Sequence, residues 1–194
     1  MFGNGGLHHG PLLTVRDVKR MKNIVLCGFM GCGKTTVGKL LAEALGMDFK
    51  DTDRLIEQRA GMSVSDIFAR FGERRFRTLE AQTVCELAAA ENGSVVSTGG
   101  GTVLNAESAQ ALRSRGVIVC LDVPLDVISR RLAGDTSRPL LNVPDRKRVI
   151  YALYGKRMPL YRAAAQLTVK TVSGLSAAYN AGLTAGTVFA SGLL

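Results

Sequence analysis

Residues 23–46 read NIVLCGFMGCGKTTVGKLLAEALG and pass from a short apolar segment through a glycine-broken turn into a segment with helical periodicity. Within this stretch, residues 28–35 (GFMGCGKT) have the spacing of a phosphate-binding P-loop, GxxxxGK followed by Ser or Thr. Glycines in such a loop allow successive backbone N–H groups to converge on phosphate oxygens. An ordinary glycine-rich turn is the alternative, and the flanking segments decide between the two.

The flanking segments predict a strand before the loop and a helix after it. Residues 24–26 form an apolar, β-branched run typical of a buried strand. Apolar residues then recur at helical spacing up to Gly46, which suits a helix end: Val37, Leu40, Leu41, Ala44 and Leu45. A helix that begins at the loop points its unpaired N–H groups and positive dipole end at the phosphates. We therefore expect Lys34 to contact the β and γ phosphates and Thr35 to bind Mg²⁺.

The length and composition predict one folded domain. The chain has 194 residues, 46% of them hydrophobic, which suffices for one well-packed domain and is short for two. No apolar run approaches the roughly 20 residues that span a bilayer, so we expect no membrane partner. Residues 1–20 lack the apolar core of a signal peptide and are expected to form a disordered extension. Residues 21–172 form the expected domain, and the glycine- and alanine-rich residues 173–194 are left as a tail without assigned structure.

The net charge of +9 predicts an anionic partner. Basic residues concentrate in residues 130–162, where only Asp135 and Asp145 are acidic. A nucleic-acid surface usually interleaves aromatic side chains for stacking, whereas the three tyrosines of this segment are spaced as in helix packing. We therefore expect a small, multiply charged substrate such as a nucleotide and no nucleic acid. The four cysteines form no CxxC pair, which favours reduced thiols and a cytoplasmic protein.

Strands and helices are expected to alternate along the rest of the chain. The expected strands after the first are residues 47–50, 94–98, 117–121 and 167–169. One helix is expected to begin at an N-cap formed by Thr52 or Asp53. Further helices are expected over residues 63–72, 76–90, 105–113, 124–132 and 144–158. Such alternation predicts an α/β fold with a central parallel sheet of about five strands flanked by helices.

Unusual residues follow three of these strands, at the sheet edge where ligands bind in α/β proteins. The first set is the P-loop. The second is Asp51 and Asp53, which alternation would place on one side of an extended segment, facing the phosphates; an acidic turn that only caps a helix is the alternative. The third is the glycine triplet 99–101, which suits either a tight turn or close approach of a substrate to bare backbone.

At this point the chain resembles a known family over about residues 22–170. The motifs occur in the order seen in shikimate kinases: residues 28–35 (GFMGCGKT), 51–53 (DTD), 76–80 (FRTLE), 99–101 (GGG), 138–141 (RPLL) and 157–161 (RMPLY). The joint order makes the resemblance specific, since a P-loop alone indicates only a nucleotide-binding protein. The resemblance implies a P-loop kinase fold with a mobile lid loop, ATP and Mg²⁺ as cofactors, and shikimate as the substrate.

The resemblance also implies the nucleotide and metal residues. The nucleotide-binding residues would be Gly31, Cys32, Gly33, Lys34, Thr35, Thr36 and Arg131, the last of which packs on adenine in the family. Thr35 and Asp51 would serve Mg²⁺, Asp51 through water. Arg138 would lie in the lid, residues 133–141, and neutralise the transferring phosphoryl group when the lid closes.

The acceptor side follows from the same resemblance. Asp53 would bind the ring hydroxyls and accept a proton, which makes Lys34, Asp53 and Arg138 the catalytic candidates. The other substrate-binding residues would be Arg77, Gly99, Gly100, Gly101 and Arg157, with Glu80 steadying Arg77. A guanidinium matches a carboxylate in two hydrogen bonds, so two arginines would select an anionic hydroxy acid. Taken alone, each arginine is better explained as a surface charge on a helix, since arginine is mostly exposed.

The sequence is therefore compatible with three functions. The first is an ATP-dependent shikimate 3-kinase in aromatic amino acid biosynthesis, which we expect to act as a monomer because a domain of this size completes its own core. The second is another small P-loop kinase, with gluconate as the obvious hydroxy acid. The third is a non-catalytic nucleotide- or nucleic-acid-binding module, which would have no need of a proton acceptor or a lid arginine.

Overall fold

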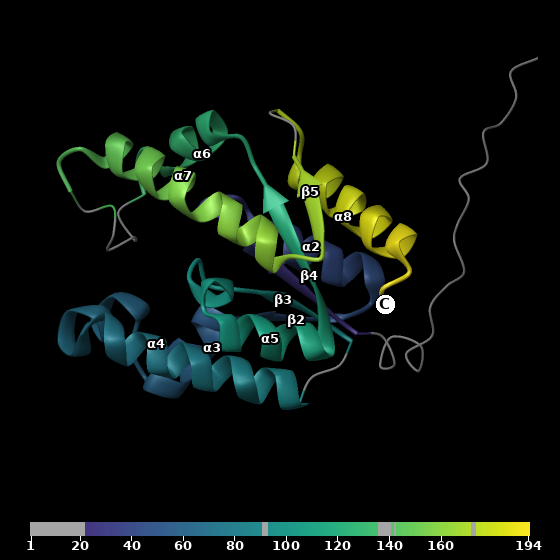
Figure 1. Ribbon diagram of the computed structural model, residues 1–194, viewed down its shortest axis with the longest axis horizontal. Coiled ribbons are helices and arrows are strands. Elements are labelled where there is room, and N and C mark those ends of the chain that lie inside the picture. The colour runs from purple at the N-terminus through teal and green to yellow at the C-terminus, as the bar shows by residue number, and fades with distance from the viewer. Residues whose placement is uncertain (1–21, 91–92, 136–140, 142, 172–173) are drawn as a thin grey trace, which may run out of the picture.

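The computed structural model describes residues 22–90, 93–135, 141, 143–171 and 174–194. Within these ranges, five parallel strands form one sheet in the order β2-β3-β1-β4-β5 (Figure 1). The strands are β1 (Asn23–Cys27), β2 (Asp48–Asp51), β3 (Ser94–Ser97), β4 (Gly116–Asp122) and β5 (Leu167–Lys170). The predicted α/β fold with a five-stranded parallel sheet flanked by helices is confirmed.

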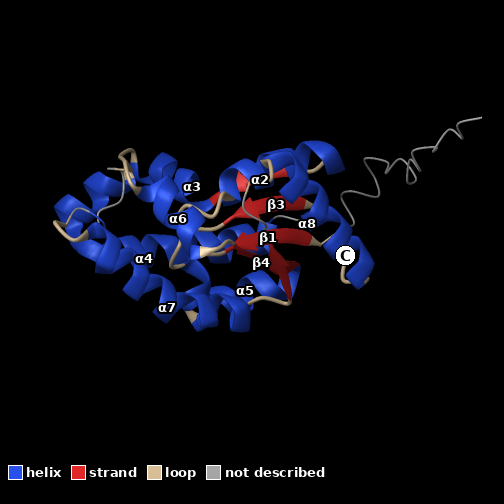
Figure 2. Cartoon of the chain, turned by 90° about the horizontal axis from the view of Figure 1, so that it is seen from above, coloured by secondary structure: helices blue, strands red, loops and turns tan. Residues whose placement is uncertain are grey.

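Helices cover both faces of the sheet, as parallel strands joined by right-handed crossovers require (Figure 2). On one face, α2 (Lys34–Leu45) packs beside α8 (Ala177–Ser191). On the other face, α5 (Ala106–Arg115) and α7 (Arg146–Ala164) pack against β4. The remaining helices lie beyond the sheet or join it to these layers: α3 (Thr52–Ala60), α4 (Val64–Ala90), the short 3₁₀ helix η1 (Thr102–Leu104) and α6 (Leu125–Leu132).

The core has a large and a small part. Every residue of β1 and β4 is buried, because both strands lie inside the sheet and are covered on both faces. The small part lies between α3 and α4 and consists of Ile56, Ile67, Phe76 and Leu79. The α3–α4 unit therefore has apolar packing of its own, separate from the sheet.

Two expected helix limits are wrong. The N-cap of α3 is Asp51, whose carboxylate accepts a hydrogen bond from the backbone N–H of Asp53, in place of Thr52 or Asp53. Helix α7 continues through Pro159 to Ala164 instead of ending at residue 158. A proline inside a helix costs one backbone hydrogen bond, but Met158 and Tyr161 are almost fully buried, and this packing holds the turn in place.

The C-terminal residues 173–194, to which the sequence analysis assigned no structure, contain helix α8. Its composition shows no clear amphipathic period because small residues occupy most positions on both sides. Its buried side consists of Asn180, Ala181, Thr184 and Val188 and packs against α2 and β5. No helix in the described part of the chain is both long and apolar enough to cross a bilayer.

Asn23 links β1 to β3 and provides a test of the fold. Its side-chain Oδ1 accepts a hydrogen bond of 3.0 Å from the backbone N–H of Ser94, and both residues are buried. The Asn23→Ala variant should lose about 1–3 kcal/mol of unfolding free energy, because a buried N–H loses its acceptor. Denaturant unfolding measures this loss. The exposed amide of Gln110 gives the control, since Gln110→Ala should stay within about 0.5 kcal/mol of the parent. Equal stabilities of the two variants would contradict the prediction.

Candidate active site

The loop between β1 and α2 is shaped by glycines in backbone conformations that other residues rarely adopt. Gly28 and Gly33 have φ angles of 139° and 93°, in the region that favours glycine. A Cβ on Gly28 would lie 2.8 Å from the carbonyl oxygen of Leu121 in β4, which leaves no room for a side chain. Gly33 directly precedes α2 and makes no side-chain cap, so the first N–H groups of the helix face the loop. N–H groups at the start of a helix are a common anion-binding arrangement in proteins.

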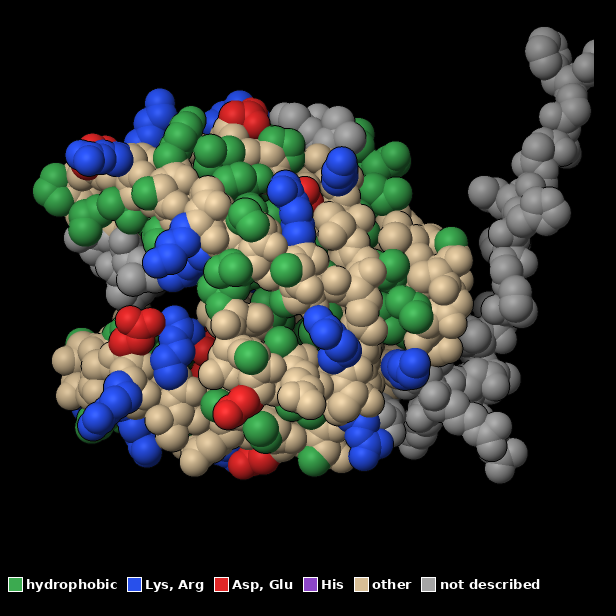
Figure 3. Space-filling model, viewed as in Figure 1, with side chains coloured by type: hydrophobic (Ala, Val, Ile, Leu, Met, Phe, Trp, Pro, Cys, Tyr) green, Lys and Arg blue, Asp and Glu red, His purple; other side chains and the backbone are tan. Residues whose placement is uncertain are grey.

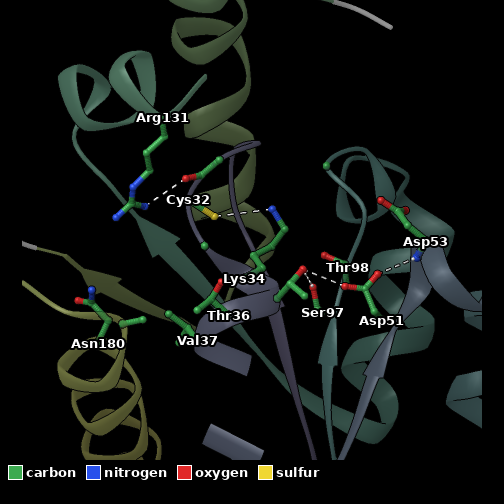
Figure 4. A pocket seen from close by; sticks show the side chains of 15 residues that line it. Cys32, Lys34, Thr36, Val37, Asp51, Asp53, Ser97, Thr98, Arg131 and Asn180 are labelled. Carbon is green, nitrogen blue, oxygen red and sulfur yellow. Dashed lines mark hydrogen bonds between the residues drawn. The ribbon is translucent and has the colours of Figure 1, made fainter. Parts of the chain in front are cut away.

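Lys34 is held inside this loop. Its Nζ donates hydrogen bonds of 3.0 and 3.2 Å to the carbonyl oxygens of Gly28 and Phe29 and lies 3.6 Å from Sγ of Cys32 (Figure 4). These contacts place an ammonium group beside the N–H groups at the start of α2. The loop therefore combines a full positive charge with the partial positive charge of the helix end.

Thr35, Asp51 and Ser97 bring oxygen atoms together from three elements. Thr35 Oγ1 donates to Oδ2 of Asp51 at 2.9 Å and lies 3.4 Å from Oγ of Ser97 (Figure 4). Hydroxyl and carboxylate oxygens are the ligands that Mg²⁺ prefers, and it usually takes only one or two carboxylates from the protein. Ser97 was not predicted, although a polar residue at the end of a strand and next to the glycine triplet was an available signal.

The two aspartates lie differently from the prediction. The chain is not extended through Asp53, because α3 begins at Thr52. Asp51 caps this helix through Oδ1 and contacts Thr35 through Oδ2, so it caps the helix and also lies beside the P-loop. Asp53 lies in the first turn of α3 and faces away from this oxygen cluster, as Figure 4 shows.

A cavity of about 410 Å³ opens over the loop. The predicted nucleotide and metal residues line it: Gly31, Cys32, Gly33, Lys34, Thr35, Thr36, Arg131 and Asp51. Arg131 reaches across from α6 and donates to the carbonyl oxygen of Gly31 at 3.1 Å. Ala177 and Asn180 of α8 also line the cavity, and nothing in the sequence pointed to them because their segment shows no motif or period.

A second, narrower cavity of about 90 Å³ lies between α4 and α7. Its lining includes the predicted acceptor residues and an apolar wall: Asp53, Arg77, Gly99, Gly100, Gly101 and Arg157, with Met30, Val64, Phe68, Phe76 and Glu80. Figure 3 shows the surface hollowed between these helices, with basic and acidic side chains at the opening. Asp53 and Gly100 line both cavities, so the two spaces meet at Asp53.

Arg77 is oriented by two glutamates of its own helix. Its Nη1 donates to Glu80 at 2.7 Å, and its Nε and Nη2 donate to Glu73 at 3.2 and 3.0 Å. Partial burial opposes the charged guanidinium, but the two carboxylates outweigh it and raise the pKa of Arg77. Glu80 is itself buried and also accepts a hydrogen bond of 2.7 Å from the hydroxyl of Thr102. Glu80 therefore fixes Arg77 relative to the loop after β3.

The glycine triplet allows this close packing. A Cβ on Gly99 would lie 2.6 Å from Oδ1 of Asp53, and a Cβ on Gly101 would lie 2.7 Å from Cζ of Arg77. From the sequence, this triplet suited either a tight turn or close approach of a substrate to bare backbone. The structure shows that the two outer glycines make room for the side chains that line the second cavity.

Tyr161 secures the middle glycine from α7. Its hydroxyl donates to the carbonyl oxygen of Gly100, and its ring is almost fully buried. Burial raises the pKa of Tyr161 to about 12, against an opposing effect of nearby Arg157. The hydroxyl therefore stays protonated and acts as a donor near neutral pH. Arg138, the remaining predicted catalytic residue, lies outside the described residues.

Comparisons with known proteins agree on one family. The family model described as shikimate kinase matches residues 30–180. A shikimate kinase of Thermodesulfovibrio yellowstonii is 50% identical over 144 residues, which are 74% of this chain and 83% of that protein. A second, of Caldanaerobacter subterraneus, is 49% identical over 144 residues, 74% of this chain and 84% of that protein.

Solved structures give the same result. A shikimate kinase of Acinetobacter baumannii in complex with shikimate matches with a TM-score of 0.86 and 36% identity, over 92% of this chain and 99% of that chain. A shikimate kinase of Aquifex aeolicus matches with a TM-score of 0.75 and 35% identity, over 88% of this chain and 98% of that chain. The resemblance stated from the motifs is thereby confirmed.

The buried hydroxyl of Tyr161 predicts a specific dependence of stability on pH. Because its folded pKa is about 12, above the ordinary value of 10.0, its contribution is complete below pH 10 and is lost as the pH rises toward 12. Between about pH 9 and pH 11, the parent should lose about 1 kcal/mol more unfolding free energy than Tyr161→Phe, which lacks the ionising group. Denaturant unfolding of both proteins at the two pH values measures the difference. Parallel pH dependences would show that Tyr161 ionises normally.

Proposed function

The chain belongs to the shikimate kinase family, and from this premise we propose that it transfers the γ-phosphoryl group of ATP to the 3-hydroxyl of shikimate, giving shikimate 3-phosphate and ADP. The observation that carries the proposal is the junction of the two cavities at Asp53. One cavity has a phosphate-binding loop, and the other has two arginines and an apolar wall. A phosphoryl donor and a cyclic acid would thus meet beside the carboxylate of Asp53.

The first cavity fits the triphosphate of ATP. Lys34 and the N–H groups at the start of α2 would bind the β and γ phosphates, and Arg131 lies where it would contact the base. The oxygens of Thr35 and Asp51, 2.9 Å apart, suit a hard divalent cation and would hold Mg²⁺. When bound, this ion neutralises negative charge on the transferring phosphate.

The second cavity fits a small cyclic carboxylic acid. The three hydrogen bonds of Arg77 to Glu73 and Glu80 leave two of its five N–H groups for a ligand. Arg157 enters from the opposite side, on α7, so the two guanidinium groups would hold one carboxylate between them. The apolar wall from Met30, Val64 and the two phenylalanines would contact the ring.

Asp53 is the proton acceptor in this proposal. It would bind the acceptor hydroxyl, take its proton as the new O–P bond forms, and so assist the attack. Lys34 and Arg138 would stabilise the charge on the transferring group, Arg138 by the family resemblance alone. One chain lines both cavities, so the proposal needs no second subunit and includes a monomer. It further includes a cytoplasmic location and a small-molecule substrate, with no role for nucleic acid.

Gluconate kinase and a non-catalytic nucleotide-binding module were the earlier alternatives. Family membership and the apolar wall favour shikimate over gluconate, which is an open-chain acid with no ring for that wall to contact. The position of Asp53 between the two cavities favours an enzyme over a binding module, since nucleotide binding alone needs no carboxylate there.

An acceptor-dependent assay tests the proposed function. ADP release, measured by a coupled assay, should require shikimate and should stay at background with gluconate or without acceptor. Asp53→Asn keeps the shape of the side chain but removes the proton acceptor, so kcat should fall by about a hundredfold or more while the KM for ATP changes by less than about threefold. Equal ADP release with and without shikimate would overturn the assignment.

Replacing the arginines tests how the carboxylate is bound. Arg77→Lys and Arg157→Lys keep the charge but lose the forked geometry, so each should weaken shikimate binding by about 1–3 kcal/mol and leave the KM for ATP nearly unchanged. Steady-state kinetics with shikimate and with its neutral amide measures this, and the parent should strongly prefer the acid. If the parent gives equal kcat/KM for acid and amide, the two arginines do not recognise a carboxylate.

A further inference from the structure

Thr52, the middle residue of the motif at residues 51–53, makes a contact that plays no part in the mechanism proposed above. Its side chain is fully buried, and its Oγ1 accepts a hydrogen bond of 2.9 Å from the backbone N–H of Gly99, which is also buried. Helix α3 begins at Thr52, directly after β2 ends at Asp51, which pairs with Ser97 of β3. The hydroxyl of Thr52 therefore extends the contact between these two segments beyond the last pair of strand residues.

The backbone N–H of Gly99 depends on this side chain for its acceptor. A buried N–H without an acceptor is costly, and β2 offers no further strand residue because the chain turns into α3. On the other side of the same residue, the carbonyl oxygen of Gly99 accepts a hydrogen bond of 3.3 Å from the N–H of Thr102 in η1. Gly99 is thus held at its N–H by α3 and at its carbonyl by η1.

The same glycine packs against the carboxylate of Asp53. A Cβ on Gly99 would lie 2.6 Å from Oδ1 of Asp53 and 2.9 Å from Oε1 of Glu80, so the bare Cα fits between these two acids. Thr52 and Asp53 are consecutive residues in the first turn of α3. The start of α3 therefore contacts Gly99 at two points, with a hydroxyl on its N–H and a carboxylate beside its Cα.

We propose that Thr52 is a positioning residue for phosphoryl transfer, which sets the distance between the carboxylate of Asp53 and the glycine triplet by binding the N–H of Gly99. The proposal rests on the proposed function. The triplet lines the acceptor cavity and Asp53 lines both cavities, so this distance decides how close an acceptor hydroxyl lies to Asp53. Proton transfer needs the two heavy atoms about 2.6–3.2 Å apart, so a small displacement here would lower the rate.

Valine is the substitution that isolates the hydroxyl. Thr52→Val keeps the branched shape and removes the acceptor, whereas Thr52→Ser keeps the acceptor and loses one methyl group. Thr83 of α4 provides the matched control. It is also buried, its hydroxyl has no hydrogen bond within the described residues, and it lines neither cavity there. Thr83→Val is thus the same chemical change in similar surroundings, without the loss of a partner.

Steady-state kinetics with shikimate and ATP measures the effect, with kcat expressed per ADP-binding site so that unfolded protein does not count. Thr52→Val should lower kcat by about tenfold or more. The KM for ATP should change by less than about threefold, because the hydrogen bonds of the P-loop do not involve Thr52. Thr52→Ser should stay within about threefold of the parent kcat, and Thr83→Val within about twofold.

A double-mutant cycle shows whether the effect passes through Asp53. In an Asp53→Asn background, Thr52→Val should lower kcat further by less than about twofold, since the proton acceptor that it positions is already lost. A residue needed only for folding would instead reduce the number of ADP-binding sites and leave kcat per site unchanged in both backgrounds.

The outcomes that contradict the proposal are distinct from those that contradict the proposed function. A kcat per site within about twofold of the parent for Thr52→Val, or losses that multiply in the double variant, would overturn the role of Thr52. If Thr52→Val binds no ADP, Thr52→Ala takes its place, and failure of both to bind ADP would assign Thr52 to folding alone. A parent that binds ADP but does not phosphorylate shikimate would overturn the proposed function.

Discussion

The burial of β1 at the centre of the sheet is the constraint on which the rest of the site depends. β1 pairs in parallel with β3 on one side and β4 on the other, and all of its residues are buried. Parallel strands end at the same edge, so the P-loop emerges between the loops that follow its two neighbours. The carbonyl of Leu121 in β4 restricts Gly28, and the end of β3 supplies Ser97. The position of the phosphate site is thus a consequence of sheet packing.

Carboxylates then organise the acceptor side. Asp51 joins the start of α3 to Thr35 in the P-loop, and buried Glu80 joins Arg77 to Thr102 after β3. Each acid binds groups from two segments far apart in the sequence, so the small α3–α4 unit is tied to the sheet by polar contacts as well as by packing. A buried carboxylate such as that of Glu80 is costly unless paired, and here it has donors on two sides. This arrangement leaves Asp53 between the two cavities.

The parts of the fold that sequence reasoning missed share a physical cause. Pro159 and the absence of a helical period in residues 173–194 are local features, and both were outweighed by packing: Met158 and Tyr161 hold α7 beyond the proline, and α8 is held by its contacts with α2 and β5. Ser97, Ala177 and Asn180 line the first cavity without belonging to a motif. Residues that only become neighbours through tertiary contacts leave little local pattern to detect.

The sequence by itself determined the fold class, the P-loop and the family, because glycine spacing, apolar runs and the order of the motifs are local or linear properties of the chain. It also named most of the residues that line the two cavities. Only the tertiary structure decided that Asp53 lines both cavities and that the glycine triplet makes room for Asp53 and Arg77. These are relations between side chains and backbone from different elements, and their geometry is set when the helices pack on the sheet.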